Sequence, residues 1–218
     1  MNLDKKVPDF LKLLVVNNNR EWFNDNKELF LEAKALFEDF IQAQIVEISK
    51  FDSQVKDLSV KDCSFRIYRD LRFSKDKTPY KIHFSAYMAR GGRKSQWSGY
   101  YTHVEPDMNI IAGGLHHPEK SVLDRVRRKI YTQPETFKKI INNSAFKTNF
   151  PKIYGEQLKS APRGYDKNFK DLYLIRFKSY DFFHYIDDEE LVSDGFFEKS
   201  IQLFKLLYPL NNYFNLGS

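Results

Sequence analysis

Cysteine is almost absent from this chain, and glycine and proline are scarce. Cys63 is the single cysteine among 218 residues, which excludes an intrachain disulfide and a cysteine-based metal cluster. With only 9 Gly and 8 Pro, the chain is neither collagen-like nor of low complexity. No run approaches the roughly 18 apolar residues of a membrane span, and residues 1–9 lack the order of a signal peptide. These absences predict a soluble cytoplasmic protein that has no membrane partner.

Aromatic and basic residues, by contrast, are abundant. The 20 Phe and 13 Tyr bring the aromatic share to 16%, and hydrophobic residues make up 42%, which is enough for a sizeable core. Lys and Arg number 35 against 29 Asp and Glu, which gives a formal net charge of +6. The length favours one domain over residues 1–218. The composition therefore predicts a globular domain whose core is built on aromatic rings.

Periodic apolar residues predict a long helix in the N-terminal part of the chain. Its apolar stripe consists of Leu29, Ala33, Leu36, Phe37, Phe40, Ile41, Gln44, Ile45 and Ile48. Segments at 63–68, 81–89, 99–105 and 108–112 are short, aromatic or partly alternating, and they predict consecutive antiparallel strands. In the second of these, Ile82, Phe84, Ala86 and Met88 occupy every second position, with His83, Ser85 and Tyr87 between them.

Helical patterns return in the C-terminal half, at 118–130 and 134–142. Residues 172–185 favour a strand, and a last helix is expected from Ser193 to a stop at Pro209. A long helix followed by strands and then by helices is typical of an α+β fold. We therefore predict a single α+β domain, whose mainly antiparallel sheet is packed by the long N-terminal helix and the C-terminal helices.

Positive charge is concentrated in residues 65–81. The stretch holds six basic residues (Arg66, Arg69, Arg72, Lys75, Lys77 and Lys81) and two acids (Asp70 and Asp76). Guanidinium groups bind phosphates and carboxylates with two parallel hydrogen bonds, and ammonium groups act as point charges. The leading hypothesis is an anion-binding pocket formed by Arg66, Arg69, Arg72, Lys77 and Tyr80, with Asp70 and Asp76 orienting the arginines. The alternative is an internal salt-bridge network.

Two other functions fit the same stretch. One is an enzyme, a hydrolase or transferase that acts on a phosphorylated small molecule, with Asp70, Asp76 and His83 as candidate catalytic groups and Lys77 beside them. The other is a nucleic-acid-binding protein, because the rings of Tyr68, Phe73 and Tyr80 are able to stack on bases. No known nucleic-acid motif occurs in the chain, so an anionic small molecule is favoured over a nucleic acid as the partner.

Metal and cofactor signals are weak. His103 and Glu105 alternate on one face of a predicted strand and would give two ligands, but two ligands make no metal site without a third. His116 and His117 are adjacent, so their side chains diverge. The chain has no Walker loop, dinucleotide fingerprint or nucleophile elbow. The sequence therefore predicts neither a metal site nor a cofactor.

The basic stretch also carries a family resemblance. Its pattern Arg-x-x-Arg-Asp-x-Arg-Phe-x-x-Asp-Lys-x-x-Tyr, on residues 66–80, resembles the signature of a bacterial domain-of-unknown-function family, number 2461. Residues 17–23, the Gly113-Gly114-Leu115 segment followed by Pro118, and residues 162–165 resemble other parts of that family. The resemblance covers about residues 10–214 and implies a single-domain bacterial protein, without implying an activity.

Overall fold

Four strands form one antiparallel sheet in the computed structural model, which describes residues 2–72 and 74–215. The strands lie in the order β1 (Phe84–Met88), β2 (Gly99–Val104), β3 (Asn109–Leu115) and β4 (Tyr180–Ile186). The helices are α1 (Lys6–Val16), α2 (Arg20–Asp25), α3 (Lys27–Ser49), α4 (Val60–Cys63), α5 (Lys120–Thr132), α6 (Pro134–Ile141), α7 (Ser144–Asn149), α8 (Leu172–Ile175), α9 (Asp188–Leu191) and α10 (Phe196–Asn215). Two short 3-10 turns, η1 (Ser53–Val55) and η2 (Gly92–Lys94), complete the described elements. The predicted single α+β domain is confirmed.

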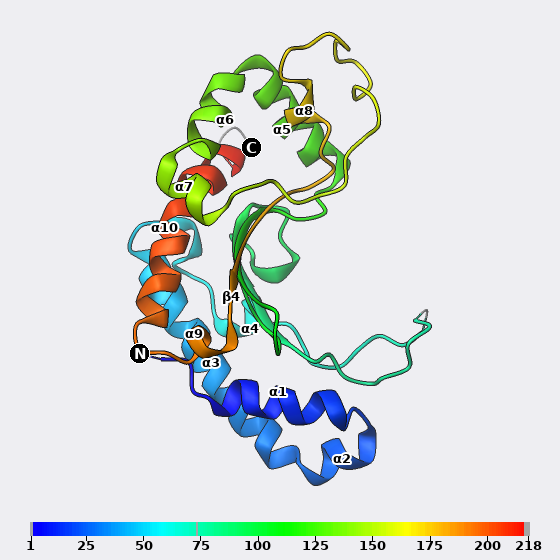
Figure 1. The fold of residues 1–218 in the computed structure, drawn as a ribbon, viewed down its shortest axis with the longest axis vertical. Coiled ribbons are helices and arrows are strands. Elements are labelled where there is room, and N and C mark those ends of the chain that lie inside the picture. The colour runs from blue at the N-terminus through cyan, green and yellow to red at the C-terminus, as the bar shows by residue number, and fades with distance from the viewer. Residues whose placement is uncertain (1, 73, 216–218) are drawn as a thin grey trace.

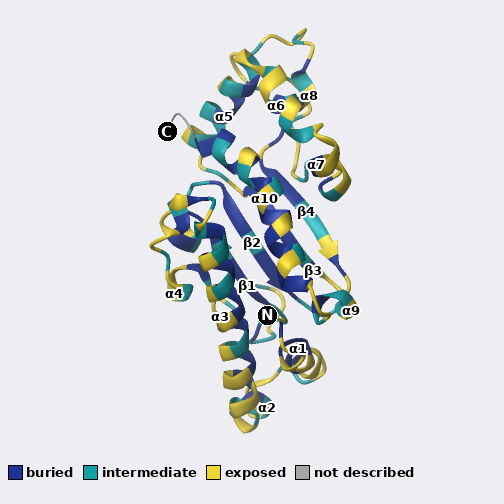
Figure 2. Cartoon of the chain, turned by 90° about the vertical axis from the view of Figure 1, so that its left-hand side faces the viewer, coloured by how far each residue is buried: buried dark blue, intermediate teal, exposed yellow. Residues whose placement is uncertain are grey.

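The helices α3 and α10 cover one face of the sheet, as Figures 1 and 2 show. Aromatic rings fill the interface: Phe37 of α3 stacks on Phe84 of β1 with ring centroids 5.5 Å apart, and Phe40 stacks on Phe196 of α10 at 5.9 Å. Such ring pairs stabilise a core beyond the area that they bury. The opposite face of the sheet lies on the concave side of the molecule, between the α1–α2 end and the α5–α8 end (Figure 1).

Strand alternation decides which side chains reach that open face. Phe84, Ala86 and Met88 are buried on the helix side of β1, as their period-two pattern predicted. Ser85 and Tyr87 lie between them and line the opposite side. The register pairs Ser85 with His103 and Tyr87 with Tyr101, so all four side chains belong to one face. The β1 and β2 part of the open face therefore carries several polar and titratable groups.

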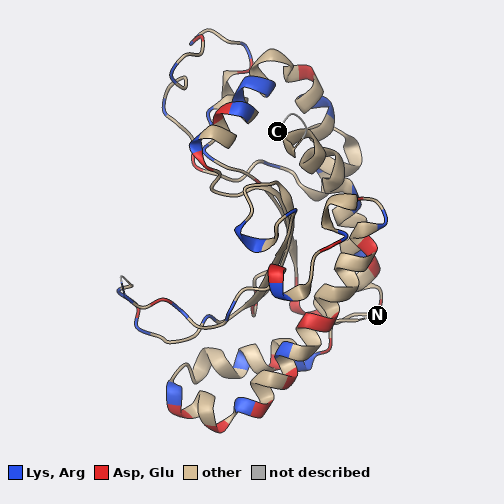
Figure 3. Cartoon of the chain, turned by 180° about the vertical axis from the view of Figure 1, so that it is seen from behind, with Lys and Arg blue, Asp and Glu red and all other residues tan. Residues whose placement is uncertain are grey.

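The strand predicted at residues 63–68 is wrong. This segment forms only isolated bridges, from Ser64 to Ala86 and from Tyr68 to Tyr80. The Lys81 N–H donates to the Ile67 carbonyl, and the Arg69 N–H donates to that of Pro79, so the basic stretch folds back on itself as an irregular hairpin. It extends away from the body of the protein (Figures 1 and 3). Charged side chains favour water over the core, and within residues 65–79 only Ile67 is buried among the described residues, so no continuous buried face holds a regular strand there.

Two predictions for the C-terminal part also need correction. Residues 172–185 divide into the short helix α8 and strand β4. Pro209 does not stop the last helix, because α10 continues to Asn215. Pro209 and Lys205 are both exposed, so water can satisfy the Lys205 carbonyl that the proline leaves without a donor. Beyond Pro209 the buried Leu210, Tyr213 and Phe214 anchor the helix in the core. None of the described helices is long and apolar enough to cross a membrane.

Candidate functional site

A cleft of about 760 Å³ lies on the open face of the sheet, opposite the helices α3 and α10. Apolar residues, among them Phe65, Trp97, Met108, Ile110 and Phe183, make up much of its lining, and its titratable groups are Lys81, His83, Tyr87, Arg93, Lys94, Tyr101, His103, His116 and Asp181. Residues far apart in the sequence thus meet in one concavity, because β1, β2 and β4 present the same face. A concave site with convergent titratable groups is the usual form of a ligand-binding or catalytic site.

Three residues at one end of the cleft form a compact cluster. The Nε2 atom of His103 lies 2.8 Å from Oε2 of Glu105, and Nδ1 of His83 lies 3.5 Å from the same oxygen. The two imidazole rings have their centroids 4.4 Å apart. The side chains of His83, His103 and Glu105 retain 25%, 10% and 14% of their exposure, so the cluster is largely sheltered yet reachable from the cleft.

Burial keeps both histidines of this cluster neutral near pH 7. Desolvation lowers the pKa of His83 to about 3, and the neighbouring His103 and Lys81 add to the shift. Desolvation also lowers the pKa of His103, although the hydrogen bond to Glu105 opposes it. The Tyr101 hydroxyl lies 2.9 Å from Nδ1 of His103, so the His103 ring is held at both nitrogens. Neutral imidazoles accept protons or ligate metal ions, and the cluster is suited to either chemistry.

A pair formed by a histidine and an aspartate lies at the other end of the cleft. The Nδ1 atom of His116 is 3.2 Å from both carboxylate oxygens of Asp181, at the start of β4. The hydrogen bond to Asp181 raises the pKa of His116 above its ordinary value of 6.5. The His116 side chain is 66% exposed, so solvent weakens the pair.

We expect NMR titration of His116 to give a pKa above 6.5, and the Asp181→Asn variant to lower it because the charged acceptor is lost. Since the pKa is raised in the folded state, the pair stabilises the protein below about pH 6.5, and this contribution is lost as the pH rises through the folded pKa. The control is Asp57→Asn, which removes an exposed carboxylate outside this cleft. An unchanged His116 pKa in Asp181→Asn would show that the ion pair does not form.

Three basic side chains belong to the lining of the cleft. Lys81, Arg93 and Lys94 all line it. Burial lowers the pKa of Lys81, and the nearby Arg66 lowers it further. Its ammonium group lies 5.5 Å from the centroid of the Phe65 ring, and Lys81 has no carboxylate partner among residues 2–72 and 74–215. The last residue of the basic stretch therefore brings an uncompensated positive charge to the cleft.

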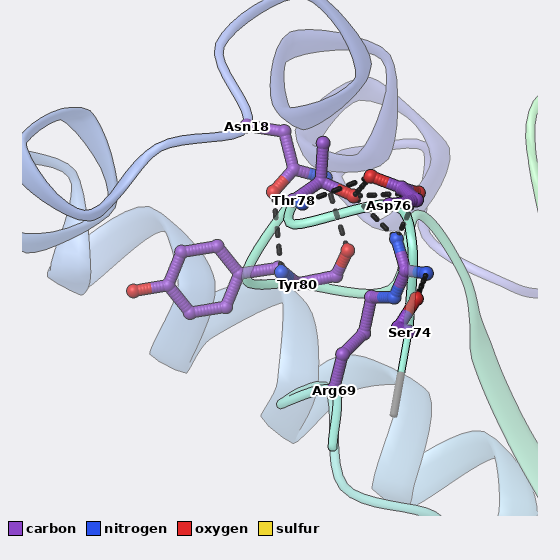
Figure 4. A network of polar contacts seen from close by, with 6 residues as sticks. All are labelled: Asn18, Arg69, Ser74, Asp76, Thr78 and Tyr80. Carbon is purple, nitrogen blue, oxygen red and sulfur yellow. Dashed lines mark hydrogen bonds and ion pairs between the residues drawn. The ribbon is translucent and has the colours of Figure 1, made fainter. Parts of the chain in front are cut away.

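The arginines of the signature have different surroundings. Arg69 donates to Asp76, Thr78 and Ser74, and its side chain is 26% exposed (Figure 4). The hydrogen bond from Arg69 holds the pKa of Asp76 at about 2. Arg72, in contrast, is 78% exposed and forms an ion pair with Asp70, whose pKa it lowers. Both acids therefore bind arginines: Asp76 joins Arg69 to the returning arm of the hairpin, and Asp70 forms a local pair with Arg72.

Lys77 and Tyr80 lie apart from the cleft. The Lys77 ammonium donates to the Leu71 carbonyl and lines a shallow hollow together with Arg20 and Asn19. Tyr80 is 5% exposed and stacks on Phe23 with ring centroids 3.9 Å apart. The amide of Asn18 bonds both the N–H and the carbonyl of Tyr80, which ties residues 17–23 to the signature (Figure 4). The predicted pocket residues Arg66, Arg69, Arg72, Lys77 and Tyr80 thus do not line the large cleft.

The sequence analysis named His83, His103 and Glu105 as candidates but did not predict that they form one cluster. His83 was a candidate acid–base group, and His103 with Glu105 a two-ligand set. Phe84 pairs with Val104, so the β1–β2 register, continued by one residue, places His83 opposite Glu105 and diagonal to His103. Only the pairing of β1 with β2 brings His83 to the other two residues, and spacing within one strand does not show this pairing. Phe73, the third ring of the nucleic-acid hypothesis, lies outside the described residues.

These features define an α+β protein that has a histidine-bearing cleft on the open face of an antiparallel sheet. Over residues 6–213 the chain matches the family described as "Conserved hypothetical protein (DUF2461)", and it belongs to that family. The family resemblance seen in the sequence is therefore confirmed. No curated protein and no solved structure matches the chain. The family description states no activity, so the function has to be inferred from the cleft itself.

Proposed function

We propose that the cleft binds an anionic small molecule through a phosphate or carboxylate group. The observation that carries this proposal is the imbalance of charge around it. Three cations, Lys81, Arg93 and Lys94, line the cleft, against one carboxylate in its lining, Asp181, which pairs with His116. A concavity with an excess of one sign of charge concentrates ligands of the opposite sign.

Lys81 is the central group of this proposal. Burial and the repulsion from Arg66 both disfavour its charged form, as the lowered pKa of Lys81 indicates. A bound anion would supply the missing counter-charge and relieve the repulsion between the two cations. In this way Lys81 contacts the anion and Arg66, which lies outside the cleft lining, adds positive charge nearby, while Arg69 bound to Asp76 joins the two arms of the hairpin.

We expect the Lys81→Met variant to bind anions at least about tenfold more weakly, since a hydrogen bond between charged groups contributes about 1.5–3 kcal/mol. The probes are inorganic phosphate, a sugar phosphate and a dicarboxylate, measured by thermal shift and isothermal titration calorimetry. Lys205→Met is the matched control, because it removes an exposed lysine from α10 on the other side of the sheet. Equal affinities in the two variants would contradict the proposal. Salt-dependent binding of an oligonucleotide, with no response to the small anions, would favour the nucleic-acid alternative.

An enzymatic function is the second candidate, and the surroundings of His103 favour it. A histidine whose two nitrogens contact Tyr101 and Glu105 is oriented for proton transfer, as a general base requires. His83 lies beside it, whereas Asp70 and Asp76, the other predicted catalytic groups, are bound to arginines of the hairpin. A hydrolase or transferase acting on a phosphorylated small molecule would place the scissile group near His103. Turnover of a sugar phosphate that His103→Asn abolishes while binding persists would support it, and unimpaired turnover would contradict it.

A further inference from the structure

We propose that His83, His103 and Glu105 bind a divalent first-row transition metal ion, with Zn²⁺ as the representative, at one end of the cleft. The three residues come from the lead into β1, from β2 and from the turn that follows β2. Each contributes one donor atom, and the three atoms lie within 4.8 Å of one another. This site does not depend on the anion-binding proposal, since a metal ion can be bound whether or not an anion occupies the cleft.

The spacing of the donor atoms suits a single ion. Zn²⁺ binds histidine nitrogen and carboxylate oxygen at about 2.0–2.2 Å, which places tetrahedral ligand atoms about 3.4 Å apart. Nδ1 of His83 is already 3.5 Å from Oε2 of Glu105. Nε2 of His103 is closer, at 2.8 Å from the same oxygen, because a proton now joins the two atoms. Replacing that proton by a metal ion would open this contact by about 0.6 Å, which side-chain rotation accommodates.

The donor set also selects the class of ion. Two imidazoles and one carboxylate suit Zn²⁺, Fe²⁺ and their neighbours, whereas Mg²⁺ and Ca²⁺ prefer oxygen ligands alone. Three protein ligands leave at least one coordination position for water or a substrate, the arrangement of catalytic rather than structural metal sites. His83 and His103 both line the cleft, so the open position would face its interior.

The Tyr101 hydroxyl, which lies beside the proposed ligands, supports the metal site. Histidines that ligate metals nearly always use their second ring nitrogen in a hydrogen bond that fixes the ring. Nδ1 of His103 has such a partner in the Tyr101 hydroxyl, 2.9 Å away. With a metal ion on Nε2, the Nδ1–H group would donate to the tyrosine oxygen. Tyr101 is thus a positioning residue for the site.

The test uses the full chain, stripped of metal with a chelator and titrated with Zn²⁺ alone by calorimetry, and with Co²⁺ alone by visible absorption. We expect one equivalent to bind and the Co²⁺ complex to show the d–d absorption of a four- or five-coordinate ion. His103→Ala and Glu105→Gln should weaken binding by more than about 100-fold, and Tyr101→Phe by about 10- to 100-fold with a changed Co²⁺ spectrum. Mg²⁺ at the same concentration should not bind.

The matched control is the double variant His116→Asn/His117→Asn, which removes two exposed histidines outside the cluster, only His116 being part of the cleft lining, and should bind Zn²⁺ as the unaltered protein does. If His103→Ala fails to fold, as judged by circular dichroism, His83→Gln replaces it, since the His83 side chain is more exposed. Absence of a one-to-one complex would overturn the proposal. So would binding that survives the loss of His83 or Glu105, or that disappears in the His116→Asn/His117→Asn control.

Discussion

Replacing Asn211 by alanine is expected to lower the free energy of unfolding by about 3 kcal/mol or more. Asn211 is 1% exposed and lies on α10 where the helix crosses the sheet. Its carboxamide oxygen accepts from the Gly114 N–H at 3.1 Å, and its amide nitrogen donates to the Gly99 carbonyl at 3.0 Å. The variant leaves both backbone groups buried without a partner, and each such group costs about 1–3 kcal/mol.

The neighbouring Asn212 supplies the matched control for this measurement. It occupies the next position of the same helix but is only half-buried, so Asn212→Ala should change stability by no more than about 0.5 kcal/mol. Urea denaturation followed by circular dichroism compares the two variants with the unaltered protein. Similar small effects in both would mean that Asn211 does not join α10 to the sheet. The Ser98 hydroxyl lies 2.7 Å from both the Asn211 carboxamide oxygen and the Gly114 carbonyl, so it keeps the second acceptor in Asn211→Ala.

The layers of the fold could be read from the sequence because they follow from local periodicity. The stripe on α3 places Ala33, Phe37 and Ile41 in the core, and the alternation along β1 buries Phe84 and Met88. Such patterns depend on 3.6-residue and two-residue repeats that are visible in one segment at a time. The α+β class and the helix-covered sheet were therefore predictable without knowledge of distant contacts.

Features that depend on distant contacts were not predictable in the same way. Pro209 ends a helix on local grounds, yet buried side chains beyond it, such as Tyr213 and Phe214, favour continuing the helix. The signature allowed both an anion pocket and an internal salt-bridge network. The pairing of Arg69 with Asp76 depends on how the hairpin folds back, which the composition does not determine.

The candidate site shows the same division between local and distant information. His103 and Glu105 share a strand face because they are two residues apart, and this was evident from the sequence. His83 joins them through the register of β1 on β2, which a one-residue slip would have reversed. Asp181 meets His116 only because β4 pairs with β3, across 65 residues of chain. The residue types therefore indicated candidate chemistry, and the strand pairing assembled it.

Replacing Gly114 by alanine is expected to lower the free energy of unfolding by about 4 kcal/mol or more, in the range reserved for severe steric conflicts. Gly114 has φ +112°, and a Cβ atom there would lie 2.0 Å from the Tyr180 carbonyl oxygen of β4. Both the contact and the backbone angle oppose the substitution, and the obstacle is main chain that a side-chain rotation cannot move. Denaturant unfolding measures the loss.

Gly195→Ala separates the two causes, because Gly195 has a similar φ of +92° but open space where the Cβ would lie. It should cost only the conformational strain of about 1–2 kcal/mol. Equal losses in the two variants would show that the contact with Tyr180 contributes nothing. Because Gly114 pairs with Asp181, the displaced β4 would also carry that carboxylate away from His116. The Gly114→Ala protein, where it remains folded, should therefore show a lower His116 pKa, whereas Gly195→Ala should not. This second readout links the close approach of β3 and β4 to the geometry of the cleft, since Asp181 of β4 reaches His116, just after β3, only while the two strands stay close.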